Sequence, residues 1–197
     1  MRPSAVSSWD PLPGPLRARG ARRAHLSIDL QLPGETPIRL VGSVPTVDGR
    51  HEIVTVSKSA KAVQVMQGWF QALALAVATG QEPLLVVSTP ARTYAYQSAG
   101  TRTPLAALHH LVLLQQVGRN QPILAPLKTL AGLHAGDDRV QDTWESERDE
   151  DWKRFTPRRV EQLCECETVS PTPTGQRTLT VQQLADELFG QLQEVEA

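Results

Sequence analysis

The sequence contains few cysteines: only Cys164 and Cys166 occur among 197 residues, and a single residue separates them. Cysteines at this spacing rarely close a disulfide with each other, and no further cysteine or nearby histidine completes a zinc site. Two thiols in a chain of this length are typical of a reducing compartment. We therefore expect a cytoplasmic protein.

Long hydrophobic runs are also absent. No stretch of about 18 uninterrupted apolar residues occurs, so we expect no membrane-spanning helix. The N-terminal segment MRPSAVSSWDPLPGPLRARGARR lacks the apolar middle of a signal peptide. Its proline, glycine and arginine content indicates a flexible leader or linker over residues 1–22, followed by one domain over residues 23–197.

A strong net charge is missing as well, since 20 Lys and Arg nearly balance 21 Asp and Glu. No overall field therefore draws the chain to nucleic acid or to an anionic membrane. The balance is uneven along the chain: residues 1–61 hold 9 basic against 5 acidic side chains, whereas residues 137–197 hold 7 against 15. A mildly basic body with an acidic, helical tail indicates either separate contact surfaces or a solvated helix face.

Common catalytic motifs are a further absence. The sequence has no P-loop, no Rossmann glycine pattern, no HExxH and no GxSxG nucleophile elbow. His109 and His110 are adjacent in a segment with helical periodicity, where neighbouring side chains point to different faces. The pair therefore cannot bind one metal ion from a regular helix, and we predict neither a metal nor a cofactor.

What is present predicts an α/β fold, with a mixed sheet and flanking helices. Apolar alternation, or a wholly apolar run, predicts strands at residues 24–32, 37–44, 51–57, 83–88 and 93–97. Helical periodicity predicts helices at residues 58–79, 104–117, 130–134, 140–152 and 181–196, with a loop at 161–176. Asp48-Gly49 is a strong hairpin signal, and Thr180 with Gln183 fits a capping box that starts the last helix.

The stretch LVGSVPTVDGRHEIVTVSKSAK, residues 40–61, has the strand–hairpin–strand–helix layout of a metal-dependent nuclease core. Such a core holds Mg²⁺ with an acid on each of the two strands, and a lysine follows the second acid. Because Mg²⁺ needs hard oxygen ligands, apolar side chains cannot replace the acids. Here Pro45 and Val56 occupy the acid positions, and Lys58 is retained.

Two nearby acids are poor substitutes. Asp48 and Glu52 flank the hairpin tip, on the order of 10–15 Å along the strands from the expected metal position. We therefore predict a nuclease-like core without catalytic residues, in which no metal ion is held.

The sequence resembles the RecC C-terminal domain family, that of the gamma subunit of exodeoxyribonuclease V. The likeness begins with the paired strands, the hairpin and the Ser/Lys-rich start of a helix that leads to GWFQALALA. It continues in the same order through PLLVVS, HHLVLLQQVGRNQPILAPLKT, TW, ESERDED and LADELFGQLQEVE, over residues 22–196. A complete gamma subunit is several times this length, so we expect an isolated domain or a truncated reading frame.

The resemblance implies an inactivated restriction-endonuclease-like fold and a subunit that is not itself an enzyme. It implies RecB-like and RecD-like partner subunits, and contact with duplex-end DNA, in a complex that repairs double-strand breaks. Candidate contacts to DNA phosphates or partners, which give no sequence readout, are Arg17, Arg19, Arg22, Arg23, Lys58 and Lys61.

Two alternatives remain open on the sequence. The chain could be an unrelated α/β protein-binding module, which would have a different order of strands in its sheet. It could also be a live metal-dependent nuclease that uses displaced acids such as Asp48 or Glu52. Mg²⁺-dependent cleavage of linear duplex DNA, lost on Asp48→Ala, distinguishes this second alternative.

Overall fold

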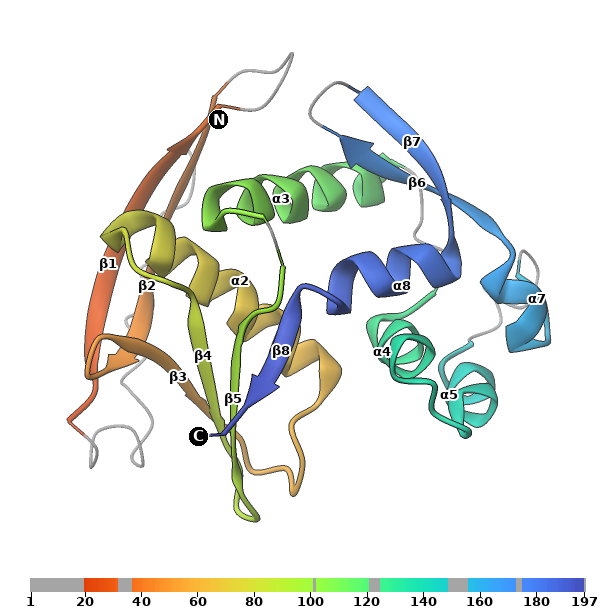
Figure 1. The fold of residues 1–197 in the computed structure, drawn as a ribbon, viewed down its shortest axis with the longest axis horizontal. Helices are drawn as coiled ribbons and strands as arrows, with labels where there is room; N and C mark the ends of the chain where they lie inside the picture. Colours follow the sequence, from red (N-terminus) through yellow and green to blue (C-terminus); the bar gives the residue numbers. More distant parts are fainter. Residues whose placement is uncertain are drawn as a thin grey trace, which may run out of the picture.

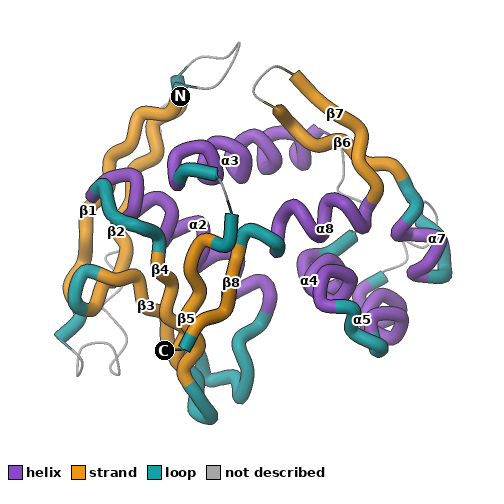
Figure 2. Tube along the Cα trace, in the orientation of Figure 1, coloured by secondary structure: helices purple, strands orange, loops and turns teal. Residues whose placement is uncertain are grey.

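A computed structural model describes residues 20–31, 37–100, 102–120, 125–148, 156–172 and 175–196. Within these ranges the chain forms a six-stranded sheet, a separate two-stranded hairpin and a set of helices (Figures 1 and 2). The predicted α/β class, with a mixed sheet and flanking helices, is confirmed. Residues 1–19, most of the expected leader, lie outside the described part of the chain.

The main sheet has the order β1-β2-β3-β4-β5-β8. Its strands are β1 (Arg22–Leu30), β2 (Ile38–Val47), β3 (Arg50–Val54), β4 (Leu84–Ser88), β5 (Thr93–Ser98) and β8 (Leu192–Val195). Only the β3–β4 pair is parallel, and every other neighbouring pair is antiparallel. Parallel strands need a crossover connection, which helix α2 (Ala62–Thr79) supplies.

The β2–β3 hairpin forms at the predicted Asp48-Gly49 turn. Val47 pairs with Arg50, and the two residues between them have positive φ angles of 50° and 80°. A two-residue turn with both residues in the left-handed region matches the twist of the flanking strands. The Asp-Gly dipeptide therefore fixes the register of the hairpin.

Helix α2 lies directly on the sheet and forms the first hydrophobic core with it. Trp69 and Leu73 of the helix meet Leu85 and Val87 of β4, and all four are essentially inaccessible to water. A Cβ on Gly68 would lie 2.7 Å from Leu85 Cδ1, so glycine allows the helix to approach the strand this closely. Helix α3 (Pro104–Asn120) packs on the outer side of α2.

A second core lies beside the sheet and contains Trp144 at its centre, fully buried. The Trp144 indole Nε1 donates a hydrogen bond of 3.0 Å to the Pro157 carbonyl. The surrounding elements are α4 (Leu127–Ala135), α5 (Val140–Glu147), α7 (Val160–Cys164), α8 (Val181–Phe189) and the hairpin β6 (Glu167–Thr172) with β7 (Gly175–Thr180). Figure 1 shows these elements at the right, away from β1 and β2.

Two predictions for the C-terminal part were wrong. The expected loop at 161–176 contains the end of α7, the whole of β6 and the start of β7. The expected helix at 181–196 ends at Phe189, and residues 192–195 form β8 on the edge of the main sheet. Gly190 follows the last residue of the helix, and a Cβ there would lie 2.4 Å from the Asp186 carbonyl oxygen, so glycine is required at this position. Pairing with β5 then outweighs the helical periodicity of the sequence.

The bounds of other elements also differ. The first long helix starts at Ala62, four residues later than predicted, because residues 55–61 form a loop after β3. Helix α5 ends at Glu147, and the rest of the predicted helix at 140–152 lies largely outside the described residues.

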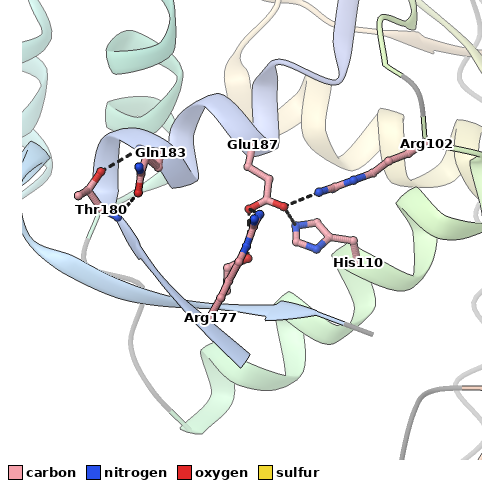
Figure 3. Close-up of polar contacts among 7 residues, drawn as sticks. Arg102, His110, Arg177, Thr180, Gln183 and Glu187 are labelled. Atoms are coloured by element: carbon pink, nitrogen blue, oxygen red, sulfur yellow. Dashed lines mark hydrogen bonds and ion pairs between the residues drawn. The ribbon is translucent and has the colours of Figure 1, made fainter. Parts of the chain in front are cut away.

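A buried carboxylate joins the second core to α3 (Figure 3). Glu187 of α8 has a side chain only 8% exposed and forms ion pairs with Arg102 and, at 2.7 Å, with Arg177 of β7. His110 Nε2 of α3 lies 3.5 Å from Glu187 Oε1, and the Ser170 hydroxyl of β6 donates a hydrogen bond of 3.2 Å to Oε2. One side chain thus connects α8 with α3 and with both strands of the small hairpin.

The arginines decide the protonation state of Glu187. Burial alone raises the pKa of this carboxyl group, but hydrogen bonds from Arg102 and Arg177 outweigh it, and the pKa lies below its usual value of 4.5. Glu187 is therefore ionised throughout the neutral range, and the ion pairs remain formed.

The predicted capping box positions this glutamate. The Gln183 backbone N–H donates to the Thr180 hydroxyl at 3.2 Å, and the Thr180 N–H donates to Gln183 Oε1 at 2.9 Å (Figure 3). The reciprocal pair satisfies two of the free N–H groups at the start of α8. It also fixes the residue at which α8 begins, and therefore the face of the helix on which the Glu187 side chain lies.

We expect Glu187→Gln to lower the free energy of unfolding by about 2 kcal/mol, because it leaves two arginines without their buried partner. Urea unfolding near neutral pH measures the loss. Since the folded-state pKa of Glu187 is lowered, its contribution is full above pH 4.5 and is lost as the pH falls below that value. The difference between the two proteins should therefore shrink in acid.

The matched control is Glu194→Gln, which removes an ion pair to Arg92 between side chains 50% and 61% exposed. Pairs of this kind contribute less than about 1 kcal/mol. Equal losses for the two variants would contradict the role assigned to Glu187.

Candidate functional site

The carboxyl ends of the parallel strands β3 and β4 bring two loops together. Residues 55–61 follow β3 and residues 89–92 follow β4, and the Thr55 N–H donates to the Ser88 carbonyl at 3.0 Å. Both loops lie at the bottom of Figure 1. In open α/β sheets this end of the parallel strands is the usual place for a binding site. We call residues 55–61 and 89–92 the loop edge.

The first loop is held firmly at both ends. The buried Thr55 hydroxyl accepts hydrogen bonds from the Ser57 N–H at 3.2 Å and from Gln64 Nε2 at 2.9 Å. Gln64 Oε1 in turn accepts from the Lys61 N–H at 3.2 Å. The loop therefore presents a fixed surface, with Val56 95% exposed and the side chains of Lys58 and Lys61 in solvent.

The second loop is a tight turn closed by Thr89. Its hydroxyl accepts from the N–H groups of Ala91 and Arg92, at 3.2 and 3.0 Å, and donates to the Arg92 carbonyl at 2.7 Å. The Arg92 guanidinium lies 4.0 Å from the centroid of the Tyr94 ring and 3.3 Å from a Glu194 oxygen. Arg92 therefore interacts with Tyr94 and Glu194, whereas the lysine side chains of the first loop are exposed to solvent.

The structure does not bring the two nuclease-like acid positions together. The Pro45 carbonyl accepts a hydrogen bond of 2.9 Å from His51 Nδ1, at the hairpin end of β3. Val56 follows the opposite end of that strand, beyond Val54. The residues from His51 to Val54 alone span on the order of 10 Å. Lys58 lies with Val56 at the loop edge, so only one of the two positions is beside the retained lysine.

The two alternative acids are also separated in their contacts. Glu52 is 4% exposed and accepts a hydrogen bond of 2.9 Å from the Ser88 hydroxyl, whereas Asp48 is exposed in the hairpin turn. Among the described residues, no group of three or more His, Cys, Asp or Glu side chains is placed to hold a metal ion.

The predicted basic contacts fall into two places. Arg22 and Arg23 begin β1, where Arg23 pairs with Pro45 and donates to the Ser43 hydroxyl at 3.1 Å. Lys58 and Lys61 lie at the other end of the sheet, on the loop edge. Arg17 and Arg19 lie outside the described residues. The basic residues consequently do not form one patch in the described structure.

A cavity that the sequence did not predict lies at the hairpin end of the sheet. Its volume is about 540 Å³, and the β2–β3 turn, the end of α2, the start of β4 and the end of β5 surround it. His51 contributes to its lining and is fully buried. Burial lowers the pKa of His51, although hydrogen bonding with Pro45 and Gln71 opposes the effect. The only sequence signal was a histidine at an inward-facing strand position.

Comparison with known proteins identifies a family. The family model of the RecC C-terminal domain matches residues 9–136, well over half of the chain. The match includes β1 to β5, α2, α3, α4 and the entire loop edge. No curated protein and no solved structure matches the chain. The helices of the described part are all too short or too polar to cross a bilayer.

We expect the double substitution Pro45→Asp with Val56→Asp to leave the protein without Mg²⁺-dependent cleavage of linear duplex DNA, because the two new carboxylates would lie at opposite ends of β3. Calorimetric titration with Mn²⁺ provides a second measurement, and the variant should bind no more tightly than the unaltered protein. New cleavage, or a new tight Mn²⁺ site, would show that the two positions converge.

A chain cut after Gly136, where the family match ends, should lose cooperative unfolding. The cut removes Glu187 and β8, and it exposes Leu130, Leu133 and other residues that the second core buries. Urea unfolding followed by circular dichroism, with the full chain as the reference, measures the effect. A cooperative transition retained by the shortened chain would show that residues 137–196 fold as an independent addition.

Proposed function

The chain belongs to the RecC C-terminal domain family, and we propose that it is a non-catalytic part of a RecBCD-type exodeoxyribonuclease V complex. In this role it contacts RecB-like and RecD-like subunits and, within the complex, duplex-end DNA during double-strand break repair in the cytoplasm. The observation that carries the proposal is the family match over residues 9–136. Membership also removes the alternative of an unrelated α/β binding module.

The arrangement β1–β2–β3–α2–β4 supports descent from a nuclease core. An antiparallel meander is followed by a crossover helix and then a strand parallel to β3, which is the frame expected of a restriction-endonuclease-like fold. The acid positions hold Pro45 and Val56, and Glu52 is occupied by its bond to Ser88. We therefore propose that this frame is retained for binding rather than for hydrolysis.

Val56 is the best anchor for a partner subunit on the loop edge. An aliphatic side chain 95% exposed on a loop fixed by Thr55 and Gln64 loses little entropy when a partner covers it. Lys58 and Lys61 flank it and can pair with acidic side chains at the rim of the interface, or with DNA phosphates, without reading sequence.

An active nuclease that uses displaced acids is the competing function. Incubation of linear duplex DNA with the protein and Mg²⁺ or Mn²⁺ tests it directly, and we expect the DNA to remain intact. Cleavage that disappears in Asp48→Ala or Glu52→Gln would replace the proposed role with a catalytic one.

We expect the chain to co-purify with RecB-like and RecD-like subunits when they are expressed together, and Val56→Asp to weaken the complex about tenfold, because it places a charge at the centre of the contact. The dissociation constants are measured by immobilising the partner subunits on a surface and titrating them with each variant of the protein.

Val41→Asp is the matched control, since Val41 is 75% exposed on β2 and lies away from the loop edge. Both substitutions are at exposed positions and should leave the unfolding free energy unchanged. No association at all would refute the proposed function. Association weakened equally by the two variants would refute only the placement of the interface.

A further inference from the structure

The main sheet has one face against α2 and an opposite face, which we call the outer face. A Cβ on Gly68 of α2 would meet Leu85 of β4 and Ile53 of β3, so these two strand residues point toward the helix. Successive side chains of a strand point to opposite sides of the sheet. Glu52 of β3 and Val86 of β4, which lie opposite each other in the register, are therefore on the outer face.

The outer face is enclosed in its middle and open toward β2. Glu52 is only 4% exposed, and so is Ala95 of β5, which lies on this face by its pairing with β4. Val41 of β2, on the same face by the same alternation, is 75% exposed. A carboxyl group in the middle of a sheet face loses contact with water when a further segment lies over it. Helix α2 is on the other side of the sheet and does not provide this cover.

The burial of Glu52 indicates what kind of segment covers it. The Ser88 hydroxyl donates one hydrogen bond of 2.9 Å to Glu52 Oε1. One neutral hydrogen bond does not offset the removal of a carboxylate from water, whereas a cation beside the carboxylate does so together with it. The covering segment should therefore carry positive charge, and also apolar side chains to lie on Val86 and Ala95.

The residues that precede β1 have this composition. Residues 9–19 read WDPLPGPLRAR, in which Trp9 and two leucines are apolar, and Arg17 and Arg19 outnumber one acid. Three prolines fix φ and lack an N–H group, which suits a chain that lies across a sheet without joining it as a strand. The family match begins at Trp9, so these residues are part of the family's domain.

The length of this segment and its point of attachment also fit. It leads into β1, whose first residue, Arg22, lies opposite Thr46 and next to the start of β3. Neighbouring strands are about 4.8 Å apart, so β5 is roughly 20 Å from β1 across the sheet. Eleven residues can span up to about 36 Å. Residues 9–19 can therefore cross the middle of the outer face and leave Val41 exposed.

We propose that the outer face of the sheet is the docking site for residues 9–19 of the same chain. The arginines of the segment lie beside Glu52, and its apolar side chains cover Val86 and Ala95. The domain then begins at Trp9 rather than at residue 23, and the middle of the outer face is closed to protein partners.

A double-mutant cycle in the full-length protein tests the contact. Glu52→Gln, the pair Arg17→Gln with Arg19→Gln, and the three substitutions together are compared by urea unfolding. Because the two sets of changes remove the same contact, the folding equilibrium constant of the triple variant should be about tenfold larger than additive effects predict. Arg2→Gln, which lies before the segment, is the matched control, and its effect should add to that of Glu52→Gln.

Two shortened chains provide a second measurement. A chain that begins at Trp9 should unfold at the same urea concentration as the full-length protein, whereas one that begins at Gly20 should unfold at a lower concentration or fail to fold. Additive effects in the cycle, or equal unfolding midpoints for the two shortened chains, would overturn the proposal. A dimer in sedimentation equilibrium that Glu52→Gln dissociates would also overturn it, and would assign the outer face to a second copy of the chain.

Discussion

The ion pairs of the buried Glu187 carboxylate with Arg102 and Arg177 are the interactions on which the arrangement of the elements depends. The carboxylate is nearly enclosed, and it is stable as an anion only because Arg102 and Arg177 reach it from two different parts of the chain. Removing a charge from water is unfavourable unless geometry and partners compensate, so the arginines and the capping box at Thr180 form one unit. Through this unit the small β6–β7 hairpin and the helices around Trp144 are fixed to α3 and hence to the main sheet.

Two surfaces lie at opposite ends of the parallel pair of strands β3 and β4. At one end, the loop edge presents an exposed valine and two lysines from a loop secured by Thr55 and Gln64. At the other end lies the cavity of about 540 Å³ beside the β2–β3 turn. The proposed role as a binding domain rests on these surfaces and on the family match over residues 9–136.

Local signals were sufficient for much of this fold. Features that depend on a few neighbouring residues were predicted correctly. They are the Asp48-Gly49 turn, the apolar strand β4 and the capping box at Thr180, and the motifs also identified the family. The wrong predictions concern segments whose structure depends on residues far away in the sequence. Residues 192–195 have helical periodicity but pair with β5. The polar strands β6 and β7 pair with each other and are held by Glu187 and by packing of β6 on α3. The cavity around His51 was invisible because it is shared by four separate elements.

Strand β8 has a consequence for how the protein is made. It occupies the edge of the sheet next to β5, yet it follows the other described elements in the sequence. During synthesis, the hydrogen-bonding groups on the outer side of β5 stay unpaired until residues 192–195 leave the ribosome. Arg102 likewise lacks its partner until Glu187 has been made. An open strand edge readily pairs with other chains. Until β8 is made, β5 is therefore an open edge at which a nascent chain can pair with another copy.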